Sequence, residues 1–167
     1  MPDKQLIVHT IPPVFAPDSR VLLLGSLPSP KSRVQGFYYG HPQNRFWPTL
    51  AAVLNEPAPA REDIAAKKQL LLRHRLALWD VLASCLISGA ADASISQPQP
   101  NDIASLLAKT QIQAIFCTGA TAYKLYQRLC LPTTGLAAQQ LPSTSPANRR
   151  YNNEQLKNAY QAITQHI

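Results

Sequence analysis

Three polar segments of the chain carry residue types that could bind a charged substrate and act on it. Residues 25–32, with the sequence GSLPSPKS, combine a glycine with small hydroxyl side chains. Glycine lets a backbone turn sharply, and exposed amides beside it suit a phosphate or a carbonyl oxygen. A plain tight turn with polar side chains is the alternative interpretation. The segment lacks a Gly-Lys-Ser/Thr ending, which argues against nucleoside triphosphate hydrolysis.

The second segment, residues 36–48, crowds aromatic side chains, an asparagine and an arginine into a stretch that begins as a loop. An aromatic ring on such a loop can stack on a nucleobase, a contact worth about 1–3 kcal/mol per base. Phe46 and Trp47 are more simply core residues at the start of a helix, because large aromatic side chains dominate burial. Tyr38, Tyr39 and Asn44 are the candidates for ligand contact.

The third segment, residues 141–151, is a Ser/Thr-rich loop that two prolines stiffen and that ends in paired arginines. Hydroxyl, amide and guanidinium groups make many of the protein contacts to a phosphodiester backbone. Ser143 and Arg149 are therefore candidate hydrogen-bond donors to phosphate. A solvated connector with two surface arginines is the alternative.

Four short apolar segments are predicted to be the strands that position these loops. Residues 20–25 and 114–119 are largely apolar and end in glycine, which is typical of strands buried on both faces of a parallel sheet. Residues 76–79 are a third candidate that could equally begin a helix, and a fourth lies near residues 138–141. Ligand sites in such sheets form outside the carboxyl ends of the strands. The loops that follow these four segments are therefore expected to meet in one site.

Helical patterns alternate with the strands. They cover residues 46–54, 61–75 and 120–129, a helix through residue 108 that Asn101 or Asp102 can cap, and a last helix that Asn152 or Asn153 can cap. The alternation predicts an α/β fold, a three-layer α/β/α sandwich around a small parallel sheet of about four strands. Because neither a repeat nor a shift in composition divides the chain, residues 1–167 are expected to form a single domain.

Composition excludes several classes of protein. The hydrophobic fraction of 46% is typical of a globular chain, and no apolar run approaches the roughly 20 residues of a bilayer span. The amino-terminal residues lack the pattern of a secretory signal, so we expect a cytoplasmic protein. Cys85, Cys117 and Cys130 are too widely spaced for a metal knuckle, and their odd number argues against a disulfide framework. The net charge of +7 favours a polyanionic partner.

Together these segments resemble the uracil-DNA glycosylase superfamily, and in particular its mismatch-specific uracil/thymine-DNA glycosylases. The residues that match their first turn, aromatic loop and late loop are Gly25, Pro28, Phe37, His41, Pro42, Asn44, Arg45, Phe46, Trp47, Pro142 and Ser143. Three sequences, residues 25–28, residues 38–47 and Leu78-Trp79-Asp80-Val81, are similar to the superfamily's hypoxanthine-DNA glycosylase branch. The resemblance implies an enzyme that hydrolyses the N-glycosidic bond of a flipped, deaminated base, either hypoxanthine or uracil, and leaves an abasic site.

Two residues depart from the pattern of the mismatch-specific enzymes. Leu27 stands where they keep the asparagine that orients the attacking water, and Leu141 stands where they keep asparagine or histidine. A leucine side chain can neither polarise water nor hold a carbonyl group. In the hypoxanthine branch the loop asparagine takes over the polar role, which assigns it here to Asn44.

The resemblance implies roles for the residues expected at the base. Tyr39 stacks on the flipped base, Asn44 orients water or binds the base edge, and the amides of Ser26 and Leu27 reach the base carbonyl. Asp80 accepts an N–H of hypoxanthine or acts as a base toward water. Helix capping is the alternative for Asp80. A protonated His41 would favour the departing anion, unless it is only a hydrogen-bonded spacer of its loop.

The same resemblance implies how duplex DNA containing a deaminated base is held. Ser143 binds phosphate, while Thr144, Ser145 and Pro146 press into the gap that the flipped nucleotide leaves. Lys31, Arg149 and Arg150 add salt-dependent affinity for the backbone. We expect a monomer with no cofactor, no metal and no membrane partner.

Two other functions fit parts of the sequence. The change to Leu27 would suit a protein that binds lesions or nucleotides on the same scaffold without cleaving them. A small α/β hydrolase with Ser26 or Ser29 as nucleophile is the third hypothesis, but the chain has no Gly-x-Ser-x-Gly elbow.

Overall fold

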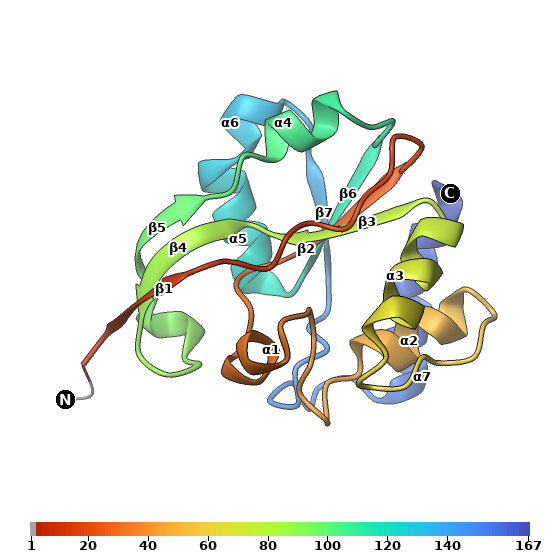
Figure 1. Cartoon of the computed structure of the whole chain (residues 1–167), viewed down its shortest axis with the longest axis horizontal. Helices are drawn as coiled ribbons and strands as arrows, with labels where there is room; N and C mark the ends of the chain where they lie inside the picture. Colours follow the sequence, from red (N-terminus) through yellow and green to blue (C-terminus); the bar gives the residue numbers. More distant parts are fainter. Residues whose placement is uncertain (1–2) are drawn as a thin grey trace.

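The computed structural model describes residues 3–167 and contains two sheets (Figure 1). One is parallel, with the strand order β3-β2-β6-β7, and the other is antiparallel, with the order β1-β4-β5. The strands are β1 (Gln5–Val8), β2 (Val21–Gly25), β3 (Leu76–Asp80), β4 (Leu82–Ile87), β5 (Ser96–Pro100), β6 (Ala114–Thr118) and β7 (Ala138–Leu141).

The parallel sheet contains all four predicted strands. Strand β2 lies in its interior, with Gly25 beside Asp80 of β3 and Leu24 beside Cys117 of β6. Residues 76–80 form a strand, so the alternative that they begin a helix is wrong. Asp80 consequently does not cap a helix, because β4 begins two residues later.

The antiparallel sheet was not predicted from the sequence. Strand β4 follows β3 after one residue, pairs with β1 and forms a hairpin with β5. Strand β5 contains prolines at positions 98 and 100, which argue against a strand in a sheet interior but are tolerated at an edge, where β5 lies. The chain leaving β1 then crosses to the parallel sheet, where Val14 forms a bridge with Leu78.

Helices cover both faces of the parallel sheet. The α-helices are α1 (Pro30–Gln35), α2 (Phe46–Val53), α3 (Ile64–Arg73), α4 (Ile103–Ala108), α5 (Ala120–Leu129), α6 (Leu131–Thr134) and α7 (Asn153–Tyr160), and short 3-10 helices cover Asp92–Ser94 and Gln161–Gln165. Helices α2, α3 and α7 lie on one side, and α4, α5 and α6 lie on the other (Figure 1). The three-layer α/β/α prediction is confirmed.

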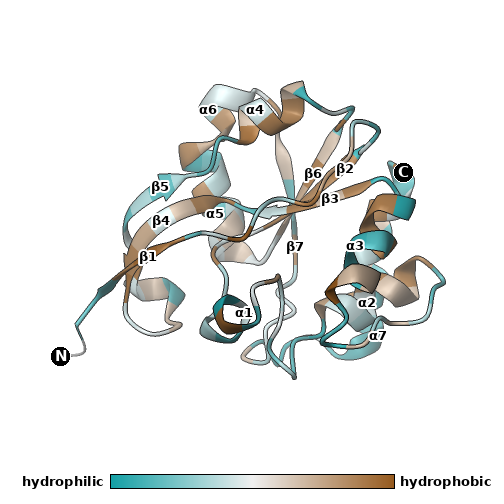
Figure 2. Ribbon diagram, in the orientation of Figure 1, coloured by the Kyte–Doolittle hydropathy of each residue, from teal (hydrophilic) through white to brown (hydrophobic). Residues whose placement is uncertain are grey.

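Alternation along β2 explains the two cores. Val21 and Leu23 face the cluster that contains α2, α3 and α7, while Leu22 and Leu24 face the cluster under α4 and α5. Successive strand residues point to opposite faces of a sheet, so a strand that is apolar throughout can bury both of its faces. Figure 2 shows this hydrophobic colouring along the central strands.

Helix boundaries follow their capping residues. Helix α3 begins three residues later than predicted, because the Asp63 side chain accepts a hydrogen bond from the amide of Ala66. Asn152, rather than Asn153, caps α7 through a reciprocal pair of bonds with Gln155. Helix α1 falls in a segment predicted to be a loop, where Ser29 caps it and a proline occupies its first turn.

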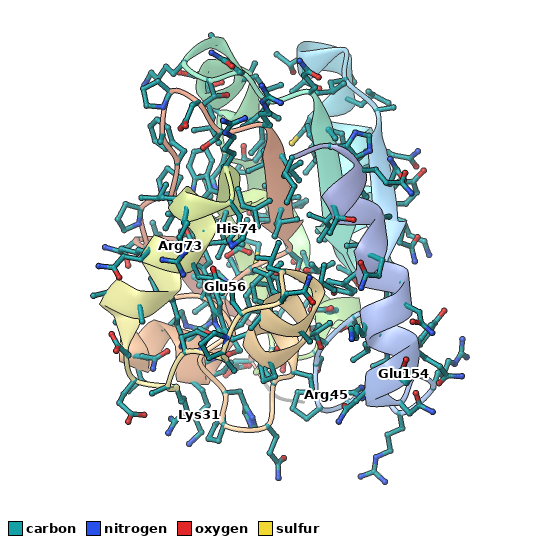
Figure 3. The ribbon with its side chains drawn as sticks, turned by 90° about the vertical axis from the view of Figure 1, so that its right-hand side faces the viewer. Lys31, Arg45, Glu56, Arg73, His74 and Glu154 are labelled. Atoms are coloured by element: carbon teal, nitrogen blue, oxygen red, sulfur yellow. The ribbon has the colours of Figure 1, made fainter. Side chains whose placement is uncertain are left out.

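An ion-pair cluster joins the end of α3 to the loop after α2. Arg73 and His74 both contact Glu56, with His74 Nε2 at 2.6 Å and an Arg73 guanidinium nitrogen at 2.8 Å from Glu56 Oε2 (Figure 3). The three cysteines are buried free thiols. Within residues 3–167, no helix is both long and apolar enough to cross a membrane.

Candidate active site

A cavity of about 500 Å³ lies at the carboxyl ends of β2, β3 and β6. Its volume is within the range of small-ligand pockets. The loops that follow β2 and β7 contribute to it, whereas β3 and β6 contribute their last residues, Asp80 and Thr118. The residues that line it are Gly25, Ser26, Leu27, Pro28, Ser29, Pro30, Lys31, Ser32, Arg33, Tyr38, Tyr39, His41, Asn44, Asp80, Ile87, Gly89, Ala90, Asp92, Thr118, Ser143, Thr144, Ser145, Pro146 and Ala147.

Asp80 is a nearly buried carboxylate in this cavity. It ends β3 beside Gly25, and a Cβ atom at Gly25 would lie 2.5 Å from Asp80 Oδ1 and 3.0 Å from the Tyr39 hydroxyl. Glycine is therefore needed at position 25 for space, whereas the sequence suggested a sharp turn. Burial raises the pKa of Asp80 above its ordinary value of 3.8, while a hydrogen bond and the charge of His9 act in the opposite direction.

His9 is the partner of Asp80 that was not predicted from the sequence. His9 Nε2 lies 2.9 Å from Asp80 Oδ2, and the two side chains are 1% and 4% exposed. His9 follows strand β1 of the antiparallel sheet, 71 residues away in the chain. No spacing pattern connects residues so distant, and β1 itself was not predicted, so the sequence carried no signal for this pair.

Tyr39 is held rigidly at the wall of the cavity. Its ring stacks on Phe46 with centroids 3.9 Å apart and planes 12° apart, and its hydroxyl lies 2.7 Å from Thr118 Oγ1. Its backbone has a φ of 54°, which is uncommon outside glycine. Burial raises the pKa of Tyr39 well above 10.0, so the phenol stays protonated. Because Phe46 covers one face of the ring, only the other face is available to a ligand.

The carboxamide of Asn44 has a defined orientation. Its Oδ1 accepts hydrogen bonds from the Phe46 amide at 2.9 Å and from Thr144 Oγ1 at 2.8 Å. A backbone amide can only donate, so the atom facing it must be the carbonyl oxygen, and the amide nitrogen is then placed by elimination. Since both bonds use Oδ1, Asn44 offers N–H donors to the cavity.

Arg45 joins the aromatic loop to the late loop. Its guanidinium donates to the carbonyl oxygens of Tyr151 at 2.7 Å and Asn148 at 2.9 Å. Its backbone amide donates to the Thr144 carbonyl oxygen at 3.1 Å. The adjacent Asn44 and Arg45 thus hold one loop against another that follows about a hundred residues later.

The structure corrects the expectation for Thr144 and separates the predicted DNA-contacting residues. Thr144 is 1% exposed and bonded to Asn44, so it is not available to press into DNA; Ser145 and Pro146 remain at the cavity wall. Arg149 and Arg150 are exposed but do not line the cavity, whereas the exposed Lys31 does.

The remaining predicted residues line the cavity. Ser26 and Leu27 do so beside Gly25, and the Ser143 hydroxyl accepts from the Ser145 amide at 3.1 Å. His41 also lines it, while its Nδ1 accepts from the Gln43 amide at 3.0 Å, as the loop-spacer alternative expects. Thr118 and the hairpin residues between β4 and β5 are further lining residues that were not predicted. Among residues 3–167, no cluster of His, Cys, Asp and Glu side chains is suited to a metal ion.

Comparison with known proteins identifies the family. Residues 12–166 match the uracil DNA glycosylase superfamily. A protein of Methanosarcina acetivorans named hypoxanthine DNA glycosylase is 31% identical over 163 residues, which is 96% of this chain and 100% of that protein. A protein of the same name from Methanosarcina barkeri is 30% identical over 140 residues, which is 83% of this chain and 87% of that protein.

A solved structure agrees with this match. The solution NMR structure of a Methanosarcina acetivorans protein, described as a candidate uracil DNA glycosylase, superposes with a TM-score of 0.75 at 29% identity. The superposition covers 96% of this chain and 99% of that one. This chain therefore belongs to the uracil DNA glycosylase superfamily and is a DNA glycosylase of that superfamily. DNA is the substrate class that the family implies.

Proposed function

We propose that the chain hydrolyses the N-glycosidic bond of hypoxanthine, and also of uracil, in duplex DNA and leaves an abasic sugar. The observation that carries the proposal is one cavity lined by an acceptor with a fixed position, Asp80, and a donor with a fixed orientation, Asn44. The name that both Methanosarcina proteins carry supports hypoxanthine as a substrate.

The two side chains complement one edge of the base. Hypoxanthine presents an N1–H donor beside its O6 acceptor, and uracil presents an N3–H donor between two carbonyl acceptors. An ionised Asp80 can only accept, and the free N–H groups of Asn44 can only donate. Adenine presents the opposite pattern, an unprotonated N1 beside an amino group, and would leave both protein groups unpaired. A site of this kind rejects the wrong base strongly, because buried polar groups without partners are costly.

The cavity also supplies a platform for an extruded base. Flipping a nucleotide out of the stack costs a few kcal/mol, and the cost is least for a mispaired base. The open face of the Tyr39 ring can recover about 1–3 kcal/mol by stacking. Its support by Phe46 and Thr118 means that little conformational freedom is lost when the base arrives.

Cleavage of the C–N bond develops positive charge on the sugar and negative charge on the departing base. The N–H groups of Asn44, and the backbone amides of Ser26 and Leu27, are donors that can stabilise the base oxygen as it becomes negative. Donors held in place before the reaction are effective because they need no reorganisation as the charge develops. Hypoxanthine and uracil leave as fairly stable anions, which lessens the need for a strong acid.

Exposed cations near the cavity support contacts with the DNA backbone there. Lys31 lines the cavity mouth, and Arg149 and Arg150 follow the late loop that Arg45 holds. Lys31 and Arg45 lie along the same lower edge of the molecule in Figure 3. Contacts of this kind to phosphate provide affinity without base specificity.

A base panel tests the proposal. Duplex oligonucleotides that contain one hypoxanthine, uracil, xanthine or adenine, opposite each of the four bases, are incubated with excess protein, and abasic sites are detected by strand scission. We expect scission at hypoxanthine and uracil and none at adenine. Asp80→Asn should reduce the ratio of excision at hypoxanthine to excision at adenine, because a carboxamide can donate a hydrogen bond as well as accept one. A shift in gel mobility without scission at any base would contradict the proposal and indicate a lesion-binding protein.

A further inference from the structure

The pair of His9 and Asp80 brings two sheets together at the cavity. Asp80 ends a strand of the parallel sheet, and His9 follows the edge strand of the antiparallel sheet. Their contact of 2.9 Å is shielded from solvent, since neither side chain is more than 4% exposed. An ionised carboxylate can only accept, so His9 donates through Nε2–H.

The backbone around His9 is anchored from several directions. The His9 amide donates to the Ala83 carbonyl oxygen of β4 at 2.7 Å. The Tyr38 hydroxyl lies 3.0 Å from the Ile11 carbonyl oxygen and 2.9 Å from that of Pro12, and the Tyr38 ring lies beside the imidazole at a centroid distance of 5.9 Å. These contacts fix the position of the imidazole beside Asp80.

We propose that His9 is a positioning residue for the glycosylase reaction, which holds the Asp80 carboxylate ionised and oriented for the N–H of the extruded base. The inference rests on the proposed function, in which Asp80 accepts from the base. While His9 donates to Asp80 Oδ2, a proton on Asp80 would lie on Oδ1 and turn that oxygen from an acceptor into an O–H donor, so the carboxyl group would keep less acceptor capacity for the base N–H.

The groups around Asp80 make His9 the decisive partner. Tyr38 and Tyr39 also face the carboxylate, but burial and the negative charge of Asp80 raise the pKa of both phenols, so both stay protonated and neutral. Lys31, Arg33, His41 and Asp92 line the same cavity. Burial raises the pKa of Asp80, and His9 is the side chain that opposes this rise through its hydrogen bond and its charge.

Removal of the imidazole should therefore raise the pKa of Asp80 further. Glycosylase activity that needs the ionised carboxylate falls as the pH decreases through this pKa. His9→Phe should move the acidic limb of the pH–rate profile upward. A rise of one pKa unit corresponds to an about tenfold lower rate on the acidic limb and to no loss well above it. His9→Gln, whose amide N–H can take the place of Nε2–H, should restore most of the original profile.

The experiment compares wild type, His9→Phe, His9→Gln and His74→Phe. His74→Phe is a matched control, because it removes the other histidine–carboxylate pair, His74 with Glu56, which lies outside the cavity lining. Single-turnover excision is measured between about pH 5 and 9 on whichever base the panel identifies. The Asp80 side-chain carboxyl is titrated in parallel by carbon NMR, which needs no activity. A circular dichroism melt of each variant establishes that it is folded.

We expect His9→Phe to raise the Asp80 titration and the acidic limb together by about one unit or more. His9→Gln and His74→Phe should leave both near wild type. An unchanged Asp80 titration in folded His9→Phe would overturn the inference, as would an equal loss of rate at every pH that His9→Gln does not rescue. If His9→Phe does not fold, His9→Leu replaces it. The inference is then overturned if the Asp80 titration shifts as far in His9→Gln as in His9→Leu. If wild type excises no base, but His9→Phe still raises the pH at which Asp80 titrates, only the proposed function is refuted.

Discussion

Gly25 and Asp80 are direct neighbours at the ends of β2 and β3, and no space for a side chain remains between them. A Cβ atom at position 25 would lie 2.5 Å from Asp80 Oδ1 and 3.0 Å from the Tyr39 hydroxyl. The first of these distances is far inside van der Waals contact. The absent side chain of Gly25 is thus what lets a carboxylate from one strand and a phenol from a distant loop meet at one point.

Gly25→Ala should reduce the activity of the enzyme about 100-fold while leaving most of its stability. Overpacking of this kind costs about 1–3 kcal/mol of unfolding free energy. A displacement of Asp80 and Tyr39 by about 1 Å is enough to reduce catalysis about 100-fold. Denaturant unfolding and single-turnover excision measure the two effects. A fully active Gly25→Ala protein would show that the position of Asp80 does not matter to the reaction.

Asn44→Asp separates the structural and chemical roles of Asn44. Aspartate retains an oxygen for the Phe46 amide and for Thr144 Oγ1, but it removes the N–H donors. We expect a folded protein that excises bases about 100- to 1,000-fold more slowly, the cost of removing one donor to a developing oxyanion. Asn152→Asp is the matched control, because Asn152 caps α7 away from the cavity. Equal rates in the two variants would exclude Asn44 as a donor.

Two substitutions of Tyr39 distinguish its ring from its hydroxyl. Tyr39→Phe keeps the stacking surface and loses the contact with Thr118, which should cost about 1 kcal/mol of unfolding free energy and leave the excision rate near that of wild type. Tyr39→Ala also loses the stacking and should weaken excision by about 1–3 kcal/mol. Excision kinetics on the preferred base and denaturant unfolding measure the two effects. If Tyr39→Ala were as active as Tyr39→Phe, the ring would not be the stacking platform.

Binding to undamaged duplex DNA should weaken steeply as salt is added. Each phosphate contact removed from Lys31, Arg149 or Arg150 should lower the slope of log K against log salt by about one. Fluorescence anisotropy at several salt concentrations measures the slope for each alanine variant. Lys109→Ala is the control, because Lys109 follows α4 at the opposite end of the molecule from α1 (Figure 1). An identical slope in every variant would place the DNA elsewhere.

The Glu56 cluster should make stability depend on pH. Hydrogen bonds from His74 and Arg73 lower the pKa of Glu56 below its ordinary value of 4.5. Because the folded state favours the ionised carboxylate, its stabilisation is complete above 4.5 and is lost as the pH falls through the lowered pKa. Wild type should melt at a higher temperature than Glu56→Gln at neutral pH, and the difference should vanish in acid. Glu62→Gln, at an exposed position, should show no comparable pH-dependent difference.

Local pattern was sufficient for the sheet that carries the site. Residues 21–25 and 114–118 are buried on both faces, and their apolar character makes them strands wherever a sheet can cover them. Ligand sites form at the carboxyl ends of parallel strands, and this rule correctly predicted that Ser26, Asp80 and Ser143 would lie at one cavity. Helix α1 was missed, since it is short and is identified mainly by its Ser29 cap.

The partners of these residues were decided only by the tertiary structure. The sequence by itself determined which side chains could do chemistry, because residue types and the succession of strands along the chain can be recognised locally. It did not determine that His9 contacts Asp80 or that Thr144 donates a hydrogen bond to the carbonyl oxygen of Asn44. Nor did it determine that Phe46 covers one face of the Tyr39 ring. The first two contacts join segments about 70 and 100 residues apart. Such contacts form because two sheets and their loops pack against each other, and no interval along the chain encodes that packing.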